Sequence, residues 1–144
     1  MMSHTFGGLP YLTKNDCSLL ADRAKRVSIK PGETLIQRGK ETRMVYLLLH
    51  GRVRIEGSQG TIAHIGGGQV VGEMAFLEDS LPSASAIAEE AVEAYALTWE
   101  SLSDLFEIFP HLASRFYRSL ALNLSQRLRD LLTPKKVVAS GRGQ

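Results

Sequence analysis

A succession of short extended segments between residues 26 and 98 limits the fold of this chain more than any other feature. Hydrophobic and polar residues alternate in 52–56, as in a strand with one face in solvent, whereas the apolar run 44–49 is typical of a buried strand. Turn signals such as Pro31-Gly32 recur about every eight to twelve residues, a spacing typical of sandwiches and barrels. Parallel strands need crossovers of about a dozen residues or more, so we expect antiparallel sheets. The expected strands are 27–30, 34–37, 44–49, 52–56, 61–65, 70–71, 85–88 and 92–98.

Helical periodicity appears on both sides of this β region. Thr13 with Asp16 three residues later is typical of a capping box, and it predicts a helix over 14–24. Beyond the strands, Ser101 is the expected N-cap of a helix over 101–109. A longer amphipathic pattern follows over 111–132. The sequence therefore predicts an α+β, mainly β fold in one domain, 1–132, with a flexible C-terminal tail, 133–144.

Composition and charge exclude several classes of protein. The chain has 17 basic and 15 acidic residues, a balance that gives no electrostatic reason to expect nucleic-acid binding. No apolar run approaches the roughly 20 residues of a membrane-spanning helix, and we see no signal peptide. Cys17 is the single cysteine, so no internal disulfide can form, and we expect it to be a small half-buried residue rather than a reactive thiol. These features predict a soluble, cytoplasmic protein.

No pattern of catalytic residues or metal ligands stands out in the sequence. His50 and His64 are the histidines that could suggest a metal site within the β region. Neither has a second histidine two residues away, which a metal-dependent jelly roll would need. We therefore expect no metal site and no enzymatic activity.

The stretch 66–86 concentrates features of a binding site. It begins with three glycines, and Gly72 then precedes Glu73 and a short helix-forming run. Unpaired N–H groups point outward where a helix begins, so an anion can be held there. The small residues 83–86 allow the backbone to approach a ligand closely. We expect the binding site of the chain to lie in this stretch.

Five blocks of sequence, in order, resemble the cyclic nucleotide-binding domain family. The resemblance extends from about Leu12 to Leu132. It implies an eight-stranded β-roll, a jelly-roll-like barrel, with one N-terminal helix and two C-terminal helices. The blocks are Gly32-Glu33, Gly39, the run VYLLLHG at 45–51, the glycine-rich 65–68, and Gly72-Glu73-Met74-Ala75.

The resemblance also implies roles for residues in the stretch 66–86, which corresponds to the phosphate-binding cassette of the family. Glu73 would accept a hydrogen bond from the ribose 2′-hydroxyl, and backbone N–H groups around Met74 and Ala75 would face the cyclic phosphate. The last helix would act as a lid. Alternatively, Glu73 only stabilises a helix N-terminus and the serines are ordinary turn residues. The residues implied in ligand binding are Gly72, Glu73, Met74, Ala75, Ser83, Ala84 and Ser85.

The chain departs from the family pattern at Ser83, which follows Pro82 where the family has an arginine that forks onto the phosphate. Losing the charged partner of a buried phosphate costs roughly 2–5 kcal/mol. A serine hydroxyl returns only about 0.5–1.5 kcal/mol. Arg52 and Arg54 lie on a strand that the fold could place nearby. A lesser departure is Val71, where the family usually has phenylalanine.

Two functions from different classes remain open at this point. One is a stand-alone regulatory module that binds cAMP or cGMP and passes a helix movement to an unidentified protein partner. Ala84 favours cAMP, because cGMP-preferring cassettes tend to carry threonine there. The alternative is a degenerate domain that binds no nucleotide and serves in protein interaction or dimerisation.

The helix 111–132 is long enough to form a homodimer, although Ser119, Asn123 and Arg127 interrupt a clean heptad. Direct DNA binding is not expected. Only twelve residues follow Leu132, and the DNA-binding domain of transcription-factor relatives needs about 60.

Overall fold

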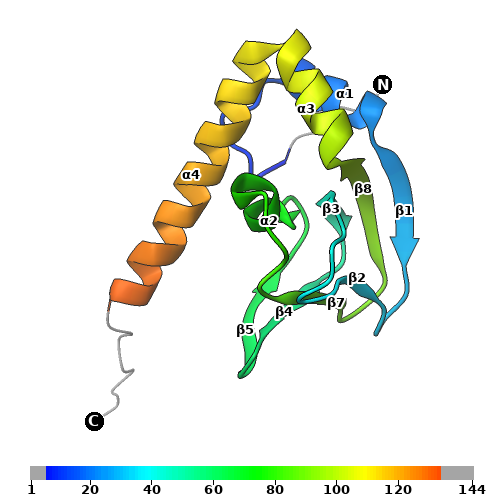
Figure 1. Ribbon diagram of the computed structural model, residues 1–144, viewed down its shortest axis with the longest axis vertical. Coiled ribbons are helices and arrows are strands. Elements are labelled where there is room, and N and C mark those ends of the chain that lie inside the picture. Colours follow the sequence, from blue (N-terminus) through cyan, green and yellow to red (C-terminus); the bar gives the residue numbers. More distant parts are fainter. Residues whose placement is uncertain (1–5, 134–144) are drawn as a thin grey trace.

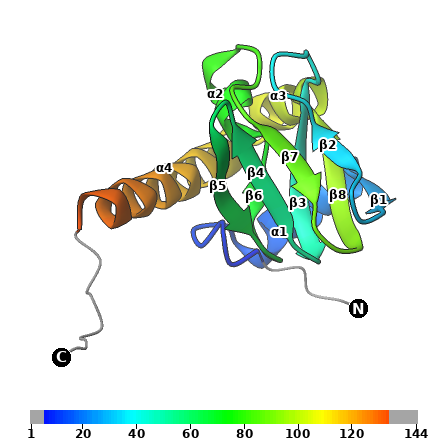
Figure 2. The same ribbon diagram turned by 90° about the horizontal axis from the view of Figure 1, so that it is seen from below.

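Two four-stranded antiparallel sheets face each other in the computed structural model of the chain, which describes residues 6–133 (Figure 1). The strand orders are β1-β8-β3-β6 in one sheet and β2-β7-β4-β5 in the other. Figure 2 shows the second sheet face-on, with α4 extending away from it. This arrangement confirms the predicted eight-stranded β-roll. The strands are β1 (Lys25–Ile29), β2 (Thr34–Ile36), β3 (Met44–His50), β4 (Val53–Gly57), β5 (Gly60–Ile65), β6 (Val70–Val71), β7 (Ser85–Ala88) and β8 (Val92–Thr98).

The helices lie before, within and after the roll: α1 (Lys14–Arg23), α2 (Glu73–Glu78), α3 (Trp99–Ile108) and α4 (Pro110–Leu132). The capping box at the start of α1 forms as predicted, with Asp16 N–H donating to Thr13 Oγ1 and Thr13 N–H donating to the Asp16 carboxylate.

The prediction that Ser101 is the N-cap of α3 was wrong. Thr98 caps α3, because β8 runs directly into the helix and the Thr98 hydroxyl accepts from the Ser101 N–H. Pro110 occupies the first turn of α4, where a missing N–H costs nothing.

Strand β3 divides the core into two parts, because its successive side chains point to opposite faces. Val45 and Leu47 pack with α1, α3 and α4 on the outer face. Leu48 packs inside the roll with residues such as Val53 and Ala94. The first cluster attaches the helices to the roll, and the second holds the two sheets together.

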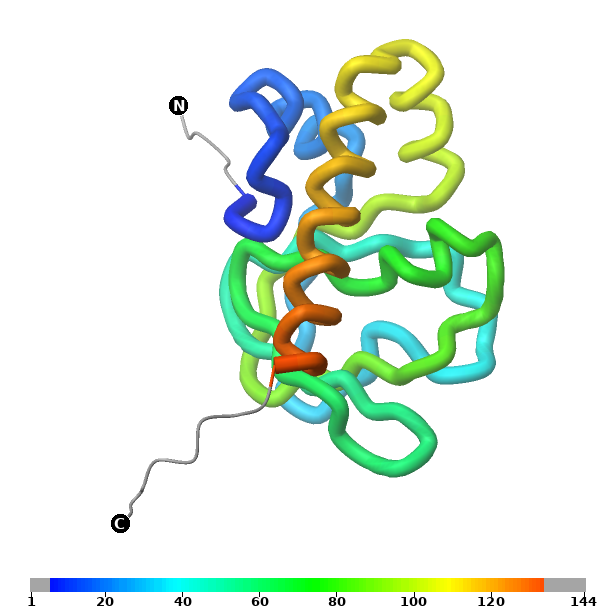
Figure 3. Tube along the Cα trace, turned by 90° about the vertical axis from the view of Figure 1, so that its left-hand side faces the viewer, coloured from blue at the N-terminus to red at the C-terminus, as the bar shows by residue number. Residues whose placement is uncertain are grey.

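Helix α4 runs along one side of the roll, past the loop that contains α2 (Figure 3). Three polar contacts, one helical turn apart, hold it there. The Ser119 hydroxyl accepts from the Tyr11 N–H at 3.0 Å, and the Asn123 amide donates to the Gly8 carbonyl. Arg127 reaches Glu73. The residues that interrupt the heptad pattern are therefore the ones that face the domain.

Apart from Thr133, the predicted flexible tail, 133–144, lies outside the described residues. Within residues 6–133, no helix combines the length and the apolar character that crossing a membrane requires. Cys17 is free and 2% exposed, so it is more deeply buried than the half-buried residue that the sequence predicted.

Candidate functional site

One cavity brings together all the residues that the sequence indicated as a site. It lies between α2, the end of β6 and the start of β7, with α4 across its mouth, and its volume is about 90 Å³. The cavity is lined by Ile36, Ile55, Ile65, Val70, Val71, Gly72, Glu73, Met74, Ala75, Pro82, Ser83, Ala84, Ser85, Ala86 and Arg127. We refer to it as the cassette cavity.

Gly72 makes the turn from β6 into α2 possible. Its φ is +91°, in the left-handed region that L side chains rarely adopt. A Cβ at this position would lie 2.8 Å from the Met44 carbonyl oxygen and 2.6 Å from Ile36 Cδ1. The glycine therefore lets the chain pass close to β3 and places the next residue at the cavity.

Glu73 is a buried carboxylic acid at the start of α2, and its residue is only 7% exposed. Burial raises the pKa of Glu73, because the charged form loses its hydration, while a backbone hydrogen bond and the charge of Arg127 act in the opposite direction. Arg127 Nη1 lies 3.5 Å from Glu73 Oε2. The cavity thus contains a carboxyl group that needs a hydrogen-bond donor or a cation.

Arg127 is the cavity residue that sequence reasoning did not assign to the site. It comes from α4, 54 residues away from Glu73 in sequence, and within residues 6–133 it is the one basic residue lining the cassette cavity. The four-residue spacing of Ser119, Asn123 and Arg127 was a signal that this face of the helix contacts polar groups. The last helix therefore places a cation at a cavity whose loop, 72–86, contains none.

Arg52 and Arg54, the alternatives suggested by the sequence, do not line the cavity. Arg52 Nε lies 2.7 Å from Glu89 Oε1, and Arg54 Nε lies 2.6 Å from Glu56 Oε2. Both guanidinium groups are thus engaged elsewhere on the second sheet.

The turn at 83–85 forms the side of the cavity opposite α2. Ser85 Oγ accepts from the Arg38 N–H at 2.9 Å, which leaves its hydroxyl proton free to be donated. Across the cavity, Ala75 is 8% exposed and Met74 is 44% exposed. Met74 therefore lies at the rim and Ala75 in the wall.

Apolar side chains make the remaining wall. Ile36, Ile55, Ile65, Val70 and Val71 line it. The cavity therefore has an apolar part, a buried acid and, among its lining residues, one cation, which suits a ligand with an apolar portion and a polar, anionic portion. No group of three potential metal ligands occurs in the part of the chain that the structure describes.

Comparison with known proteins shows the family of the chain. A family model described as the cyclic nucleotide-binding domain matches residues 26–109. The chain belongs to the cyclic nucleotide-binding domain family. It is 34% identical over 104 residues to the "Cyclic AMP receptor protein" of Thermus thermophilus, covering 69% of this chain and 46% of that protein. It is 26% identical over 135 residues to "Cyclic GMP-binding protein C" of Dictyostelium discoideum, covering 90% of this chain and 5% of that protein.

The fold is shared with solved structures of the family. The crystal structure of Thermus thermophilus Catabolite Activator Protein superposes with a TM-score of 0.71 at 30% identity, over 87% of this chain and 60% of that chain. A cyclic nucleotide-binding domain from Methylobacillus flagellatus has a TM-score of 0.75 at 21% identity, over 88% of this chain and 78% of that chain. The chain spans less than half the length of the curated relatives it matches. Family membership makes the matched region a ligand-binding domain rather than a catalytic one.

Proposed function

We propose that this domain binds a cyclic nucleotide in the cassette cavity and reports its occupancy through α4. The observation that carries the proposal is the pairing of buried Glu73 with Arg127, which joins the ligand-binding loop to the last helix at 3.5 Å. A ligand that interacts with either side chain must alter the contact between the loop and α4. Binding and a change at the helix are thereby coupled.

The chemistry of the cavity fits the two polar parts of such a ligand. A carboxylate accepts hydrogen bonds, so Glu73 suits a ribose hydroxyl. The cyclic phosphate carries one negative charge, and Arg127 supplies the opposite charge that Ser83 does not. We propose that backbone N–H groups around Met74 and Ala75 complete the phosphate site.

The size of the cavity indicates what binding requires. Its volume of about 90 Å³ is below the roughly 300–1,000 Å³ of typical ligand pockets. We therefore expect a nucleotide to displace the adjoining part of α4 outward, while the Arg127 guanidinium turns from Glu73 toward the cyclic phosphate. We propose that an unidentified protein partner detects this displacement of α4.

The direct test is calorimetry and thermal melting with cAMP and with cGMP, up to millimolar ligand. We expect saturable binding, with cAMP preferred because of Ala84, and loss of binding in Glu73→Ala. Glu78→Ala is the matched control, because Glu78 ends the same helix and does not line the cavity. Absence of binding by both nucleotides would sink the proposal.

A second variant tests the role of charge at the cassette. Ser83→Arg places a guanidinium at the position where the family has one. We expect an affinity gain of tenfold or more, which corresponds to about 1.4 kcal/mol. An unchanged affinity would mean that Arg127 already satisfies the phosphate, or that the phosphate does not lie there.

The small cavity and the closed Glu73–Arg127 pair also favour the alternative, a domain that binds no nucleotide and acts in protein interaction or dimerisation. The titration with cAMP and cGMP distinguishes the two proposals. The alternative predicts no heat of binding and no change in melting temperature with either nucleotide.

We further propose a homodimer through α4. Its last turns expose Leu128 (57%), Leu131 (83%) and Leu132 (74%), large apolar side chains without a covering element within residues 6–133. Leu128→Glu should give a monomer in sedimentation equilibrium, whereas Gln126→Glu, on the opposite face of the same helix, should not. A monomeric wild-type protein would exclude this interface.

We also propose a cytoplasmic location, which the buried free thiol of Cys17 fits.

A further inference from the structure

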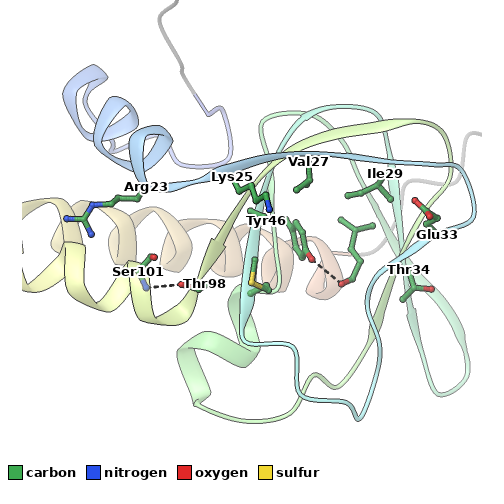
Figure 4. A pocket seen from close by; sticks show the side chains of 12 residues that line it. Arg23, Lys25, Val27, Ile29, Glu33, Thr34, Tyr46, Thr98 and Ser101 are labelled. Atoms are coloured by element: carbon green, nitrogen blue, oxygen red, sulfur yellow. Dashed lines mark hydrogen bonds between the residues drawn. The ribbon is translucent and has the colours of Figure 1, made fainter.

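A second and larger cavity opens between the edge strands β1 and β2 (Figure 4). Its volume is about 520 Å³, and none of its lining residues is shared with the cassette cavity. β1, β8 and β3 form its floor, and the turn before β2 forms its far end. We call it the edge cavity.

The lining of the edge cavity follows from the register of the first sheet. Alternate residues of a strand share a face, so Lys25, Val27 and Ile29 point the same way. Lys25 pairs in register with Ala96, and Ala96 with Tyr46 of β3. Val27, Ile29 and Tyr46 pack against the core inside the roll. The floor of the cavity is thus the inner, apolar face of the sheet.

Positive charge gathers at one end of this apolar floor. Lys25 points into the cavity in Figure 4, whereas Arg23, which also lines this end, points away from Lys25 near the start of α3. Among residues 6–133 neither side chain has an ion pair or a hydrogen bond. At the opposite end, Glu33 Oε1 accepts from the Lys30 N–H at 2.7 Å and so is engaged within its own turn. Glu33 keeps its negative charge, so the lining has two cations at one end and one carboxylate at the other.

Tyr46 adds a polarisable surface without adding charge. Burial raises the pKa of its phenol, so the ring remains neutral at physiological pH. Its hydroxyl lies 3.5 Å from the Leu35 carbonyl oxygen, which turns the ring along the cavity. Its ring therefore offers an apolar contact to whatever occupies the space.

We propose that the edge cavity binds a small acidic amphiphile, whose carboxylate lies beside Lys25, at the end that Arg23 also lines, and whose apolar body lies on Val27, Ile29 and Tyr46. The volume of about 520 Å³ is within the roughly 300–1,000 Å³ of small-molecule sites. A lysine on an edge strand also prevents strand pairing between molecules, which would explain Lys25 alone. That role explains neither the hollow beside it nor the second cation at the same end.

Decanoate is a suitable probe, with decanol as its neutral analogue and decylamine as its cationic analogue. Each is titrated below its aggregation concentration into the whole protein, followed by calorimetry and by amide NMR shifts. We expect saturable decanoate binding at least tenfold tighter than that of either analogue. The shifted amides should lie on β1, β8 and around Tyr46.

The end of α1 and the start of β1 offer a test variant and a control. Arg23→Gln with Lys25→Gln should weaken decanoate binding at least tenfold. Arg26→Gln, on the opposite face where Arg26 meets Glu93, should change it less than twofold. Arg23 and Lys25 are exposed, so the double variant should retain its melting temperature. Val27→Trp, which fills the cavity without a change of charge, should also abolish binding.

Several outcomes would overturn the proposal. They are no saturable binding of decanoate, equal binding of decanol, equal effects of the Arg26 variant and the double variant, or amide shifts confined to the cassette cavity. Glu73→Ala should leave decanoate binding unchanged. The edge cavity is thereby tested independently of the nucleotide site.

Discussion

Replacing Arg127 by glutamine should destabilise the domain, because it leaves Glu73 buried without its cation. Two unit charges 3.5 Å apart attract each other by about 4.7 kcal/mol at an effective dielectric constant of about 20, and by about 1.2 kcal/mol in water. The Arg127 side chain is 41% exposed and the Glu73 side chain 10%, so solvent screens much of the attraction. We expect the free energy of unfolding at pH 7 to fall by about 1–2 kcal/mol.

The decrease in the free energy of unfolding of Arg127→Gln should depend on pH. Burial raises the folded-state pKa of Glu73, so its favourable contribution is present below its unfolded pKa of about 4.3 and is lost as pH rises through the folded pKa. Removing Arg127 raises that pKa further and increases the loss at pH 7. At pH 4 the carboxyl is largely protonated and has no charge to pair. Urea unfolding of wild type and Arg127→Gln at pH 4 and pH 7 measures the difference.

Arg129→Gln is the control, since Arg129 is exposed on the same helix and makes no side-chain ion pair within residues 6–133. The double variant Glu73→Gln, Arg127→Gln should recover most of the loss, because no buried charge remains. Equal destabilisation at both pH values, or none at pH 7, would refute the assignment of the effect to Glu73.

Two further predictions concern elements that position the site. Gly72→Ala should lower the free energy of unfolding, measured in urea, by about 2–4 kcal/mol. The left-handed backbone strains an alanine by about 1–2 kcal/mol, and the added Cβ also lies too close to the Met44 carbonyl oxygen. Gly39→Ala, with φ of +79° and open space around it, should show the strain alone, so equal losses would contradict the clash. Asp16→Asn should lower the free energy of unfolding by roughly 2–3 kcal/mol at pH 7. Arg115 Nε and Nη2 donate to the buried Asp16 carboxylate at 2.6 and 2.9 Å, and solvent around the partly exposed Arg115 keeps the loss within this range. The hydrogen bonds from Arg115 lower the pKa of Asp16. The stabilisation by Asp16 is therefore present above its unfolded pKa of about 3.9 and is lost as pH falls through the folded pKa. If the unfolding curves of variant and wild type stay equally far apart at low pH, the Asp16–Arg115 pair is not the cause of the loss.

The fold could be predicted because its signals are local. The alternation in 52–56 and the apolar run in 44–49 each depend on neighbours in sequence, and the structure places β4 and β3 there. The capping box of Thr13 and Asp16 spans three residues and forms as expected. Where a boundary was missed, at Thr98, the strand and helix adjoin without a linker, so the end of one element is also the cap of the next.

The candidate site could be predicted only as far as one loop supplies it. Gly72, Glu73 and Ser85 fall within fourteen residues of sequence, and the structure brings them to one cavity. Arg127 could not be assigned there, because its place depends on how α4 is rotated and positioned against α2. That geometry is set by packing across the whole domain. The edge cavity was missed for the same reason, since it exists only through the separation of β1 from β2.

The row of polar contacts along α4 divides the helix into a fixed and a free length. Contacts of Ser119 and Asn123 anchor its middle to the N-terminal segment, and beyond Arg127 the leucines are exposed. Nine residues separate Asn123 from Leu132, a lever arm of about 13 Å at 1.5 Å per residue. A tilt of about 20° about the anchor would carry the tip roughly 4–5 Å, close to the pitch of one helical turn. A change of a few ångströms beside Glu73 can thus be amplified by leverage alone, with the rest of the domain held still.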